Sequence, residues 1–277
     1  MKVYYLGPES SYSHIVATRF FKQPEADLSG LSSFNAIFKQ ILAEKNSLGL
    51  LPIENSITSS VHENIDWIFQ RPCYIVGEAF LEIHLNLIGL TGAVESEIKQ
   101  VLSHPKALQQ CSDYIEKNKL LGIEATSTSE AAKLLKENRN VQTAVIGGKL
   151  LTTGDSDLTV IKADIGNVKN NFTRFVIVSA SKDQVISESR NKISVSFQLK
   201  HEPGSLLKVL EALFKRQANL TKIESRPIPA KEWEYEFWID IELGNADIDQ
   251  LLEAIKDNTL QYRLLGFYKQ GDVIVPD

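Results

Sequence analysis

The apolar run Leu48-Gly49-Leu50-Leu51-Pro52 leads into the polar segment Ile53-Glu54-Asn55-Ser56, and this passage decides the fold class. We interpret the run as a strand, and the proline marks its exit. Other short β-rich runs occur at 3–7, 74–80, 85–90, 101–102, 144–146 and 175–178. Helical patterns lie between them, among them Pro105 to Asn118 and Ser129 to Asn138. This alternation predicts a mainly parallel α/β sheet, in which ligands bind beyond the carboxyl ends of the strands.

The composition is that of an ordinary globular protein. Its 277 residues include 35 acidic and 30 basic side chains, which give a formal net charge of -5. At about 150 residues per domain, this length predicts two domains. The mild acidity argues against nucleic-acid binding. No apolar run approaches the ~18 residues of a membrane helix, and the run at 1–6 is too short for a secretory signal. We therefore expect a cytoplasmic protein that binds neither nucleic acid nor a membrane.

Metal and nucleotide chemistry has no support in the sequence. Cys73 and Cys111 have neither metal-ligand spacing nor a CxxC pattern, so we expect two free thiols in a reducing compartment. The five histidines form no ligand cluster, and the motifs GxGxxG, GxxxxGK[ST], HExxH and GxSxG are absent. The sequence therefore predicts no metal and no cofactor, and a site that works with hydroxyls, amides and at most one carboxylate.

A second module follows a polar, weakly periodic segment at 181–192, which we interpret as a linker. Strand, helix, strand, strand, helix and strand patterns then occur at 193–199, 204–217, 220–226, 233–241, 247–257 and 262–268. This βαββαβ order is ferredoxin-like. We place the first domain at 1–180 and this module at 193–271. By analogy of fold alone, such a module serves in binding or dimerisation.

Polar segments occur in the first domain where strands end and helices begin. The hydroxyl-rich segment Gly7–His14 suits an anion, because hydroxyls and free amides gather at a helix start. Helix capping by Ser11 or Ser13 explains the same pattern. In the segment Ile53–Ser56, Asn55 either contacts a ligand or caps a helix. Glu54 either takes part in the function or is a charge exposed to solvent.

Two further segments have the same character. Ser103 lies just before a helix start, and His104 alone is more typical of a cap than of a base. Gln110 lies on the apolar side of the helix, where an unpaired amide costs about 1–3 kcal/mol, so it needs either a core partner or a ligand. In the last segment, Thr173 and Arg174 enter an apolar strand. Arg174 is a natural partner for a carboxylate, although both are also acceptable strand-edge residues.

Taken in order, these segments resemble the prephenate dehydratase family over nearly the whole chain. The family motifs GPxGTFS, PIENS, SHPxALxQC and TRF resemble Gly7–Ser13, Pro52–Ser56, Ser103–Cys111 and Thr173–Phe175. The second module resembles an ACT domain. Its ESRP motif is intact at Glu224–Pro227, and its GAL[VF] motif is altered at Gly204–Leu207.

The resemblance implies a two-lobed catalytic domain like a type 2 periplasmic binding protein. One lobe is expected at about 1–79 with 161–180, and the other at 80–160. The implied activity converts prephenate into phenylpyruvate, water and carbon dioxide in phenylalanine biosynthesis. Thr173 matches the catalytic threonine, and a donor at the leaving oxygen gives about 10²–10⁴-fold in rate. The implied substrate contacts are Asn55, Ser103, Gln110, Ser11, Ser13, Arg174 and Glu54.

The resemblance also implies regulation by L-phenylalanine, bound as an allosteric inhibitor at a subunit interface of the ACT module. A glycine at the helix start lets backbone amides approach the carboxylate of the amino acid. The implied effector residues are Gly204, Ser205, Leu206, Leu207, Glu224, Ser225, Arg226 and Pro227. Two modules placed edge to edge would form a homodimer, and a pair of dimers would form a homotetramer.

The chain departs from the family pattern at several positions. Ser10-Ser11 replaces Gly-Thr, Thr58-Ser59 replaces Glu-Gly, Asn167 replaces an acidic residue, and Ser205 replaces alanine. A change from glycine to serine matters if the loop needs a positive φ. Two alternative functions stay open: an arogenate dehydratase with the same chemistry, and a regulatory protein that binds an amino acid or solute without turnover. Thr173 favours an enzyme, because a pure binder has no need for that threonine.

Overall fold

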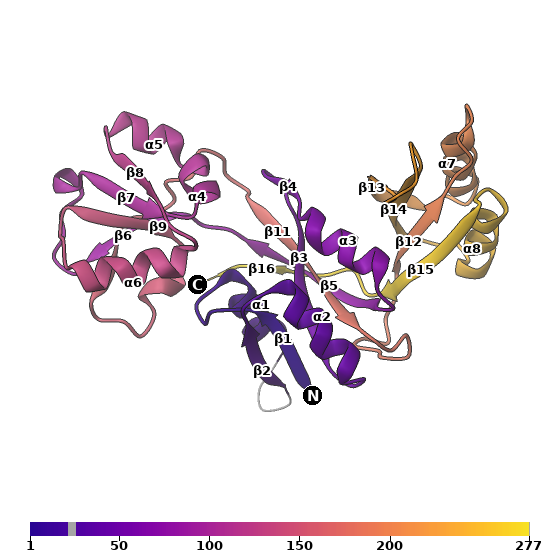
Figure 1. The fold of residues 1–277 in the computed structure, drawn as a ribbon, viewed down its shortest axis with the longest axis horizontal. Helices are drawn as coiled ribbons and strands as arrows, with labels where there is room; N and C mark the ends of the chain where they lie inside the picture. The colour runs from indigo at the N-terminus through magenta and orange to yellow at the C-terminus, as the bar shows by residue number, and fades with distance from the viewer. Residues whose placement is uncertain (22–25, 277) are drawn as a thin grey trace.

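Figure 1 shows three α/β units in a row in the computed structural model of the chain, which describes residues 1–21 and 26–276. Two lobes form the first domain, and the first lobe lies between the second lobe and the C-terminal module. None of the helices in these described ranges is long and apolar enough to span a bilayer.

The sheet of the first lobe has the strand order β2-β1-β3-β11-β5. Its strands are β1 (Lys2–Leu6), β2 (Asp27–Leu31), β3 (Leu48–Asn55), β5 (Tyr74–Glu82) and β11 (Phe172–Ser179), and β4 (Ser59–Ser60) pairs with the end of β3. Its helices are α1 (Tyr12–Phe20), α2 (Phe34–Ala43) and α3 (His62–Gln70). Strands β2, β1 and β3 are parallel, but β11 is antiparallel to β3 and β5. The sheet is therefore mixed and not mainly parallel, because β11 enters it in the reverse direction from the second lobe.

The sheet of the second lobe has the strand order β10-β6-β9-β7-β8. Its strands are β6 (Asn86–Leu90), β7 (Gln100–Ser103), β8 (Leu121–Glu124), β9 (Thr143–Gly147) and β10 (Leu158–Lys162). Its helices are α4 (Pro105–Gln110), α5 (Ser112–Lys117) and α6 (Thr128–Asn138), with short 3₁₀ turns η1 (Glu95–Glu97) and η2 (Lys149–Thr152). Residues 83–85 and 163–171 connect the lobes, so the chain passes between them twice, as the two-lobed resemblance implied.

The single helix expected from 105 to 118 is in fact two helices, α4 and α5. They meet at Cys111, whose φ of -118° and ψ of 18° leave the helical region. Asn167, in the second connection, donates its backbone N–H to the carbonyl of Gln110 at 2.7 Å. The side-chain oxygen of Asn167 accepts the N–H of Asp113 at 3.2 Å and so caps α5. A long-range contact therefore accompanies the break, which local periodicity does not encode.

The C-terminal module has the expected ferredoxin-like order. Its elements are β12 (Lys192–Gln198), α7 (Ser205–Lys215), β13 (Asn219–Pro227), β14 (Tyr235–Glu242), α8 (Ile248–Asp257) and β15 (Gln261–Tyr268). The strands are antiparallel in the order β13-β14-β12-β15. The linker is shorter than expected, because Lys192 begins β12 with its ammonium buried 2.9 Å from the Glu78 carboxylate.

The sheet of this module continues into the sheet of the first lobe. Strand β15 lies parallel to β5 where Gly266 meets Ile75 (Figure 1). A Cβ atom at Gly266 would lie 2.1 Å from the Ile75 carbonyl oxygen, so this approach needs glycine. The chain then returns along the first lobe, and β16 (Val273–Ile274) pairs with β5. The sequence predicted neither contact.

The first lobe and the module also share one hydrophobic core. Trp238 and Tyr268 of the module pack in the same cluster as Ile65 and Ile75 of the first lobe, and all are at most 1% exposed. Burial of each such side chain contributes about 1.5–3 kcal/mol. The module and the first lobe therefore stabilise each other.

Candidate active site

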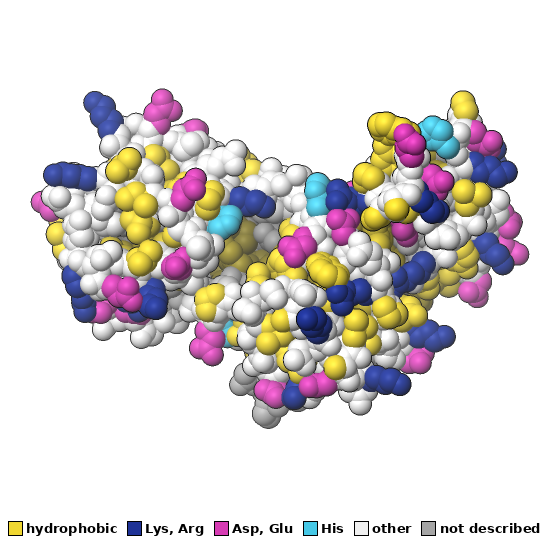
Figure 2. Space-filling model, in the orientation of Figure 1, with side chains coloured by type: hydrophobic (Ala, Val, Ile, Leu, Met, Phe, Trp, Pro, Cys, Tyr) yellow, Lys and Arg dark blue, Asp and Glu magenta, His cyan; other side chains and the backbone are white. Residues whose placement is uncertain are grey.

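A cavity of about 290 Å³ lies between the two lobes, near the lower end of the ~300–1,000 Å³ typical of ligand pockets. The first lobe contributes Tyr12, Asn55, Thr58, Val61 and Thr173; the second contributes His104, Lys106, Ala107, Gln110, Ser127 and Thr128; Ile83 and Leu85 belong to the first connection. Figure 2 shows the surface hollowed between these lobes, with apolar side chains inside the hollow. Substrate contacts from both lobes would therefore meet here.

Asn55 holds the hydroxyl of Thr173. The two residues pair across strands β3 and β11, and the Asn55 amide nitrogen donates to Thr173 Oγ1 at 3.0 Å. Asn171 Oδ1 at 2.6 Å and the Phe172 carbonyl at 3.0 Å are also acceptors for this nitrogen, so its two hydrogens are shared among three acceptors. Thr173 therefore accepts from Asn55, which leaves its own hydroxyl hydrogen to be donated. Because Thr173 lines the cavity, a ligand there can accept that hydrogen bond.

The other end of the Asn55 amide fixes the following turn. Its oxygen accepts the backbone N–H groups of Ile57 at 3.0 Å and Thr58 at 2.9 Å. With both ends of the amide bonded, the orientation of Asn55 is set, and so is its bond to Thr173. Asn55 does not cap a helix, which was one of the readings left open, because α3 begins at His62 with Val61 as its N-cap. Asn55 is instead a hydrogen-bond partner of the expected catalytic threonine.

Two departures from the expected motifs occur at strained backbone positions. Ser10 has φ 71° and Ser59 has φ 60°, both in the left-handed region that favours glycine. These are the two positions where the family pattern has glycine. Both serines therefore carry local backbone strain in this structure.

Gln110 presents its amide to the cavity from the last turn of α4. No side chain or backbone group in residues 1–21 and 26–276 hydrogen-bonds to this amide. The geometry therefore favours a contact between Gln110 and a ligand over a hydrogen bond between Gln110 and a partner in the protein core. His104 instead acts as the N-cap of α4, since its Nδ1 accepts the Lys106 backbone N–H at 3.2 Å.

Three expected contacts lie outside the cavity lining. Ser103 is fully buried and donates to the Ile146 carbonyl at 2.6 Å, which ties β7 to β9. Ser11 caps α1 and donates to the Leu6 carbonyl at 3.0 Å. Ser13 is buried within α1. In this structure all three shape the walls rather than face the cavity.

Arg174 lies on the opposite face of β11 from Thr173, since successive strand residues point to opposite faces. Its side chain is only 3% exposed. The guanidinium contacts Glu78 (2.7 Å), Glu54 (3.1 Å), Asp240 and Tyr268 (3.2 Å). The structure therefore does not bring Arg174 or its partner Glu54 into the cavity. Three carboxylates surround the guanidinium and neutralise its positive charge, so this arginine is not available to pair with an anionic ligand.

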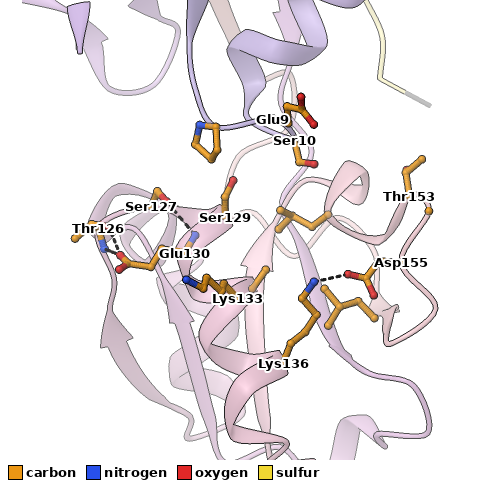
Figure 3. A pocket seen from close by; sticks show the side chains of 15 residues that line it. Glu9, Ser10, Thr126, Ser127, Ser129, Glu130, Lys133, Lys136, Thr153 and Asp155 are labelled. Atoms are coloured by element: carbon orange, nitrogen blue, oxygen red, sulfur yellow. Dashed lines mark hydrogen bonds and ion pairs between the residues drawn. The ribbon is translucent and has the colours of Figure 1, made fainter. Parts of the chain in front are cut away.

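A larger hollow of about 630 Å³ opens between the same lobes (Figure 3). In Figure 3 the loop that carries Glu9 faces α6 across this hollow. Its lysines are already paired: Lys136 lies 2.7 Å from Asp155, and Lys133 lies 3.7 Å from Glu137. A lining of this kind suits an anionic ligand less well than the smaller cavity.

Comparison with known proteins assigns the family. Residues 3–183 match the family described as prephenate dehydratase, and residues 193–259 match the ACT domain. The first match alone spans more than half of the chain. The chain belongs to the prephenate dehydratase family. It is therefore an enzyme of this family with a C-terminal ACT module.

Relatives of the prephenate dehydratase family align along nearly the whole chain. The prephenate dehydratase of Methanocaldococcus jannaschii is 33% identical over 274 residues, which cover 98% of each chain. The crystal structure of the prephenate dehydratase of Staphylococcus aureus superposes with a TM-score of 0.85 at 25% identity, covering 97% of this chain and 100% of that one. The prephenate dehydratase of Arthrobacter aurescens, solved in complex with L-Phe, superposes with a TM-score of 0.84 at 24% identity, covering 98% and 90%.

A chain of ion pairs connects the ACT module to the site. The Lys222 ammonium lies 2.9 Å from Glu224 of the ESRP motif and 2.6 Å from Glu54. Burial opposes both charges, but the pairs outweigh it: the pKa of Lys222 is raised, and Lys222 together with Arg174 lowers the pKa of Glu54. This series of ion pairs ends at Arg174, which directly follows Thr173 in the sequence.

The structure does not bring the expected effector residues together in one place. Ser205 and Leu206 line a hollow of about 370 Å³ in the ACT module, next to Gly204, whose φ of 84° begins α7. Glu224 and Arg226 instead face the first lobe. Leu207, Ser225 and Pro227 are exposed. Arg226 makes two hydrogen bonds to Asp66, at 2.9 and 2.8 Å.

Several residues of the cavity were not expected from the sequence, and Tyr12 and Lys106 are the two with the most informative chemistry. Tyr12 has a buried hydroxyl with no partner among the described residues, and burial raises its pKa, so it stays protonated. Lys106 lines the cavity from the first turn of α4. A signal for Lys106 was present, because a lysine in the first turn of a helix is electrostatically unfavourable. The described residues contain no cluster of three or more His, Cys, Asp or Glu that could hold a metal.

Proposed function

We propose that the protein converts prephenate into phenylpyruvate, carbon dioxide and water. The observation that carries this proposal is the Thr173 hydroxyl, which accepts from Asn55 and offers its hydrogen to the inter-lobe cavity. Gln110 adds an unpaired amide in the same space. These are neutral donors, and the reaction needs a donor at a leaving oxygen rather than a nucleophile or a metal.

In this reaction the bond between the ring and its carboxylate breaks, and carbon dioxide leaves. The electron pair moves through the ring, breaks the bond to the ring hydroxyl, and makes the ring aromatic. The hydroxide combines with one proton, ultimately from solvent, to give water. Thr173 donates a hydrogen bond to the departing oxygen, where negative charge develops. A donor placed in this way contributes about 10²–10³-fold in kcat.

The apolar part of the cavity suits the carboxylate that departs. Val61, Ile83, Leu85 and Ala107 line the cavity beside the polar groups. A carboxylate against such a wall is poorly solvated, whereas neutral carbon dioxide is not penalised there. Loss of the carboxylate therefore relieves an unfavourable contact.

The experiment is a turnover assay of the full chain with prephenate, read from the absorbance of phenylpyruvate in alkali. We expect turnover that persists after dialysis against EDTA, since the proposal uses no metal and no cofactor. A parallel assay with arogenate tests the alternative substrate, and faster turnover of arogenate would replace the proposal with an arogenate dehydratase. Binding of either compound without turnover would support the non-catalytic alternative.

We further propose that L-phenylalanine inhibits the enzyme through the ACT module. The hollow beside Gly204 supports this, because a left-handed glycine at a helix start leaves backbone amides open to a carboxylate. Strand β13 ends the sheet, so its edge is available to a second copy in a homodimer or homotetramer. The chain of ion pairs through Lys222 supports coupling of this module to the strand that carries Thr173.

Phenylalanine binding and assembly are tested on the full chain, since the module shares its core with the first lobe. Leu206→Ala is expected to weaken inhibition by phenylalanine while leaving kcat without phenylalanine unchanged. Light scattering is expected to give a dimer or a tetramer. Unaltered inhibition in the variant would move the effector site elsewhere, and an inhibited monomer would exclude the subunit interface.

We also propose that the protein is cytoplasmic. Cys73 and Cys111 are both buried and unpaired. Burial raises the pKa of Cys73 to about 11 and that of Cys111 to about 12, so both thiols stay protonated and unreactive. Two such thiols accord with a reducing compartment.

A further inference from the structure

Lys106 brings the only full positive charge among the described residues that line the candidate cavity. Its ammonium has no ion-pair partner within residues 1–21 and 26–276, and its side chain is exposed. The neighbouring imidazole adds no charge at neutral pH, because burial and Lys106 itself lower the pKa of His104. The cavity is therefore a place where one cation is available to an anion.

The fold gives this charge no structural task. Lys106 lies in the first turn of α4, where the helix dipole disfavours a cation. The start of the helix is fixed by its backbone, since the Lys106 N–H donates to His104 Nδ1 at 3.2 Å. Any residue with an N–H would serve as well at this position. The ammonium is thus left for a ligand.

We infer that Lys106 binds the side-chain carboxylate of the substrate, the one that the product phenylpyruvate retains. This inference rests on the proposed function. It assigns two roles in the cavity: the Thr173 hydroxyl, held by Asn55, acts at the departing hydroxyl, and Lys106 binds the carboxylate that stays.

The chemistry decides between the two carboxylates. The ring carboxylate loses its charge as carbon dioxide forms, so a cation there would stabilise the substrate more than the transition state and would slow the reaction. The side-chain carboxylate keeps its charge throughout. A cation there stabilises substrate, transition state and product equally, which lowers KM and leaves kcat unchanged.

The experiment compares Lys106→Met with the wild type, and Lys117→Met serves as the matched control. Lys117 is an exposed lysine of the same lobe that lines none of these hollows, so its variant has the same change in net charge. For Lys106→Met we expect a KM for prephenate about 10- to 100-fold higher, the range of a charged hydrogen bond, and a kcat within about threefold of the wild type. Lys106→Arg should recover part of the loss.

Inhibition by phenylpyruvate identifies which carboxylate is bound. The product phenylpyruvate keeps only the side-chain carboxylate. Its inhibition constant should therefore rise in Lys106→Met by the same factor as the KM for prephenate. A KM within twofold of the wild type would overturn the inference. So would a raised KM with unchanged inhibition by phenylpyruvate, or an equal effect in Lys117→Met.

A binding measurement separates this inference from the proposed function. Calorimetry of prephenate with Thr173→Ala, and with Thr173→Ala carrying Lys106→Met, needs no turnover. Absence of turnover in the wild type would contradict the proposed function. Equal prephenate affinity of the two variants would contradict the role of Lys106.

Discussion

Ser10 shows how a single residue stores strain beside the site. Its φ of 71° lies in the left-handed region, which costs a residue with a Cβ about 1–2 kcal/mol relative to glycine. The backbone N–H of Ser10 bonds to His14 Nδ1 at 3.1 Å, and glycine keeps that bond. The loop conformation is therefore compatible with glycine in every respect.

We accordingly predict that Ser10→Gly stabilises the protein by about 0.5–1 kcal/mol, because relief of strain exceeds the added entropy of the unfolded chain. Urea denaturation measures the change, with Ser10→Ala as the control that keeps the strain. A glycine variant no more stable than the alanine variant would show that the loop is not strained.

At the scale of the elements, Glu54 joins strands β3, β11 and β13. Its carboxylate lies 3.1 Å from Arg174 and 2.6 Å from Lys222. Burial opposes its charge, but these two cations outweigh it and hold the pKa of Glu54 below its ordinary value. A lowered carboxyl pKa contributes stability above the ordinary value of about 4.3 and loses it as pH falls through the folded pKa.

Glu54→Gln is therefore expected to be less stable than the wild type at pH 7, by about 2 kcal/mol for lost charged hydrogen bonds. The difference should shrink as pH falls below about 4. Urea denaturation at several pH values measures it. A difference that stays constant down to acid pH would mean that the ion pairs contribute nothing.

Gly266 marks the contact between the sheets of the first lobe and the ACT module. A Cβ at this position would meet the Ile75 carbonyl oxygen at 2.1 Å and its carbonyl carbon at 2.9 Å. Backbone atoms cannot rotate away, so Gly266→Ala is expected to cost about 1–3 kcal/mol of stability. Gly122→Ala is the control, because its nearest neighbour would be 3.9 Å away. Equal unfolding midpoints for the two variants would refute the close approach.

At the scale of the whole molecule, the local patterns predicted many of the elements but not the contacts between them. The apolar runs at 48–52 and 175–178 lie within strands β3 and β11, and the βαββαβ order of the module is as predicted. Asn55, Gln110 and Thr173, which the family resemblance implied as site residues, line one cavity. Local residue patterns carry such information because strand and helix periodicities are local properties.

The remaining features depend on residues far apart in the sequence. Arg174 meets Glu78 and Asp240, which lie 96 and 66 positions away, so its burial could not be predicted from the polar segment around it. The contact between Gly266 and Ile75, and the break of the helix at Cys111, have the same origin. The unpaired Lys106 became informative only when the cavity around it was known.

The central claim is that the Thr173 hydroxyl, oriented by Asn55, assists departure of the ring hydroxyl. The measurement that tests it most directly is kcat for prephenate in Thr173→Ala, with Thr173→Ser as the control that keeps the hydroxyl. We predict that kcat of the alanine variant falls about 10²–10³-fold, that its KM stays within a few fold, and that the serine variant retains most activity. A Thr173→Ala enzyme with kcat within a few fold of the wild type would contradict the account.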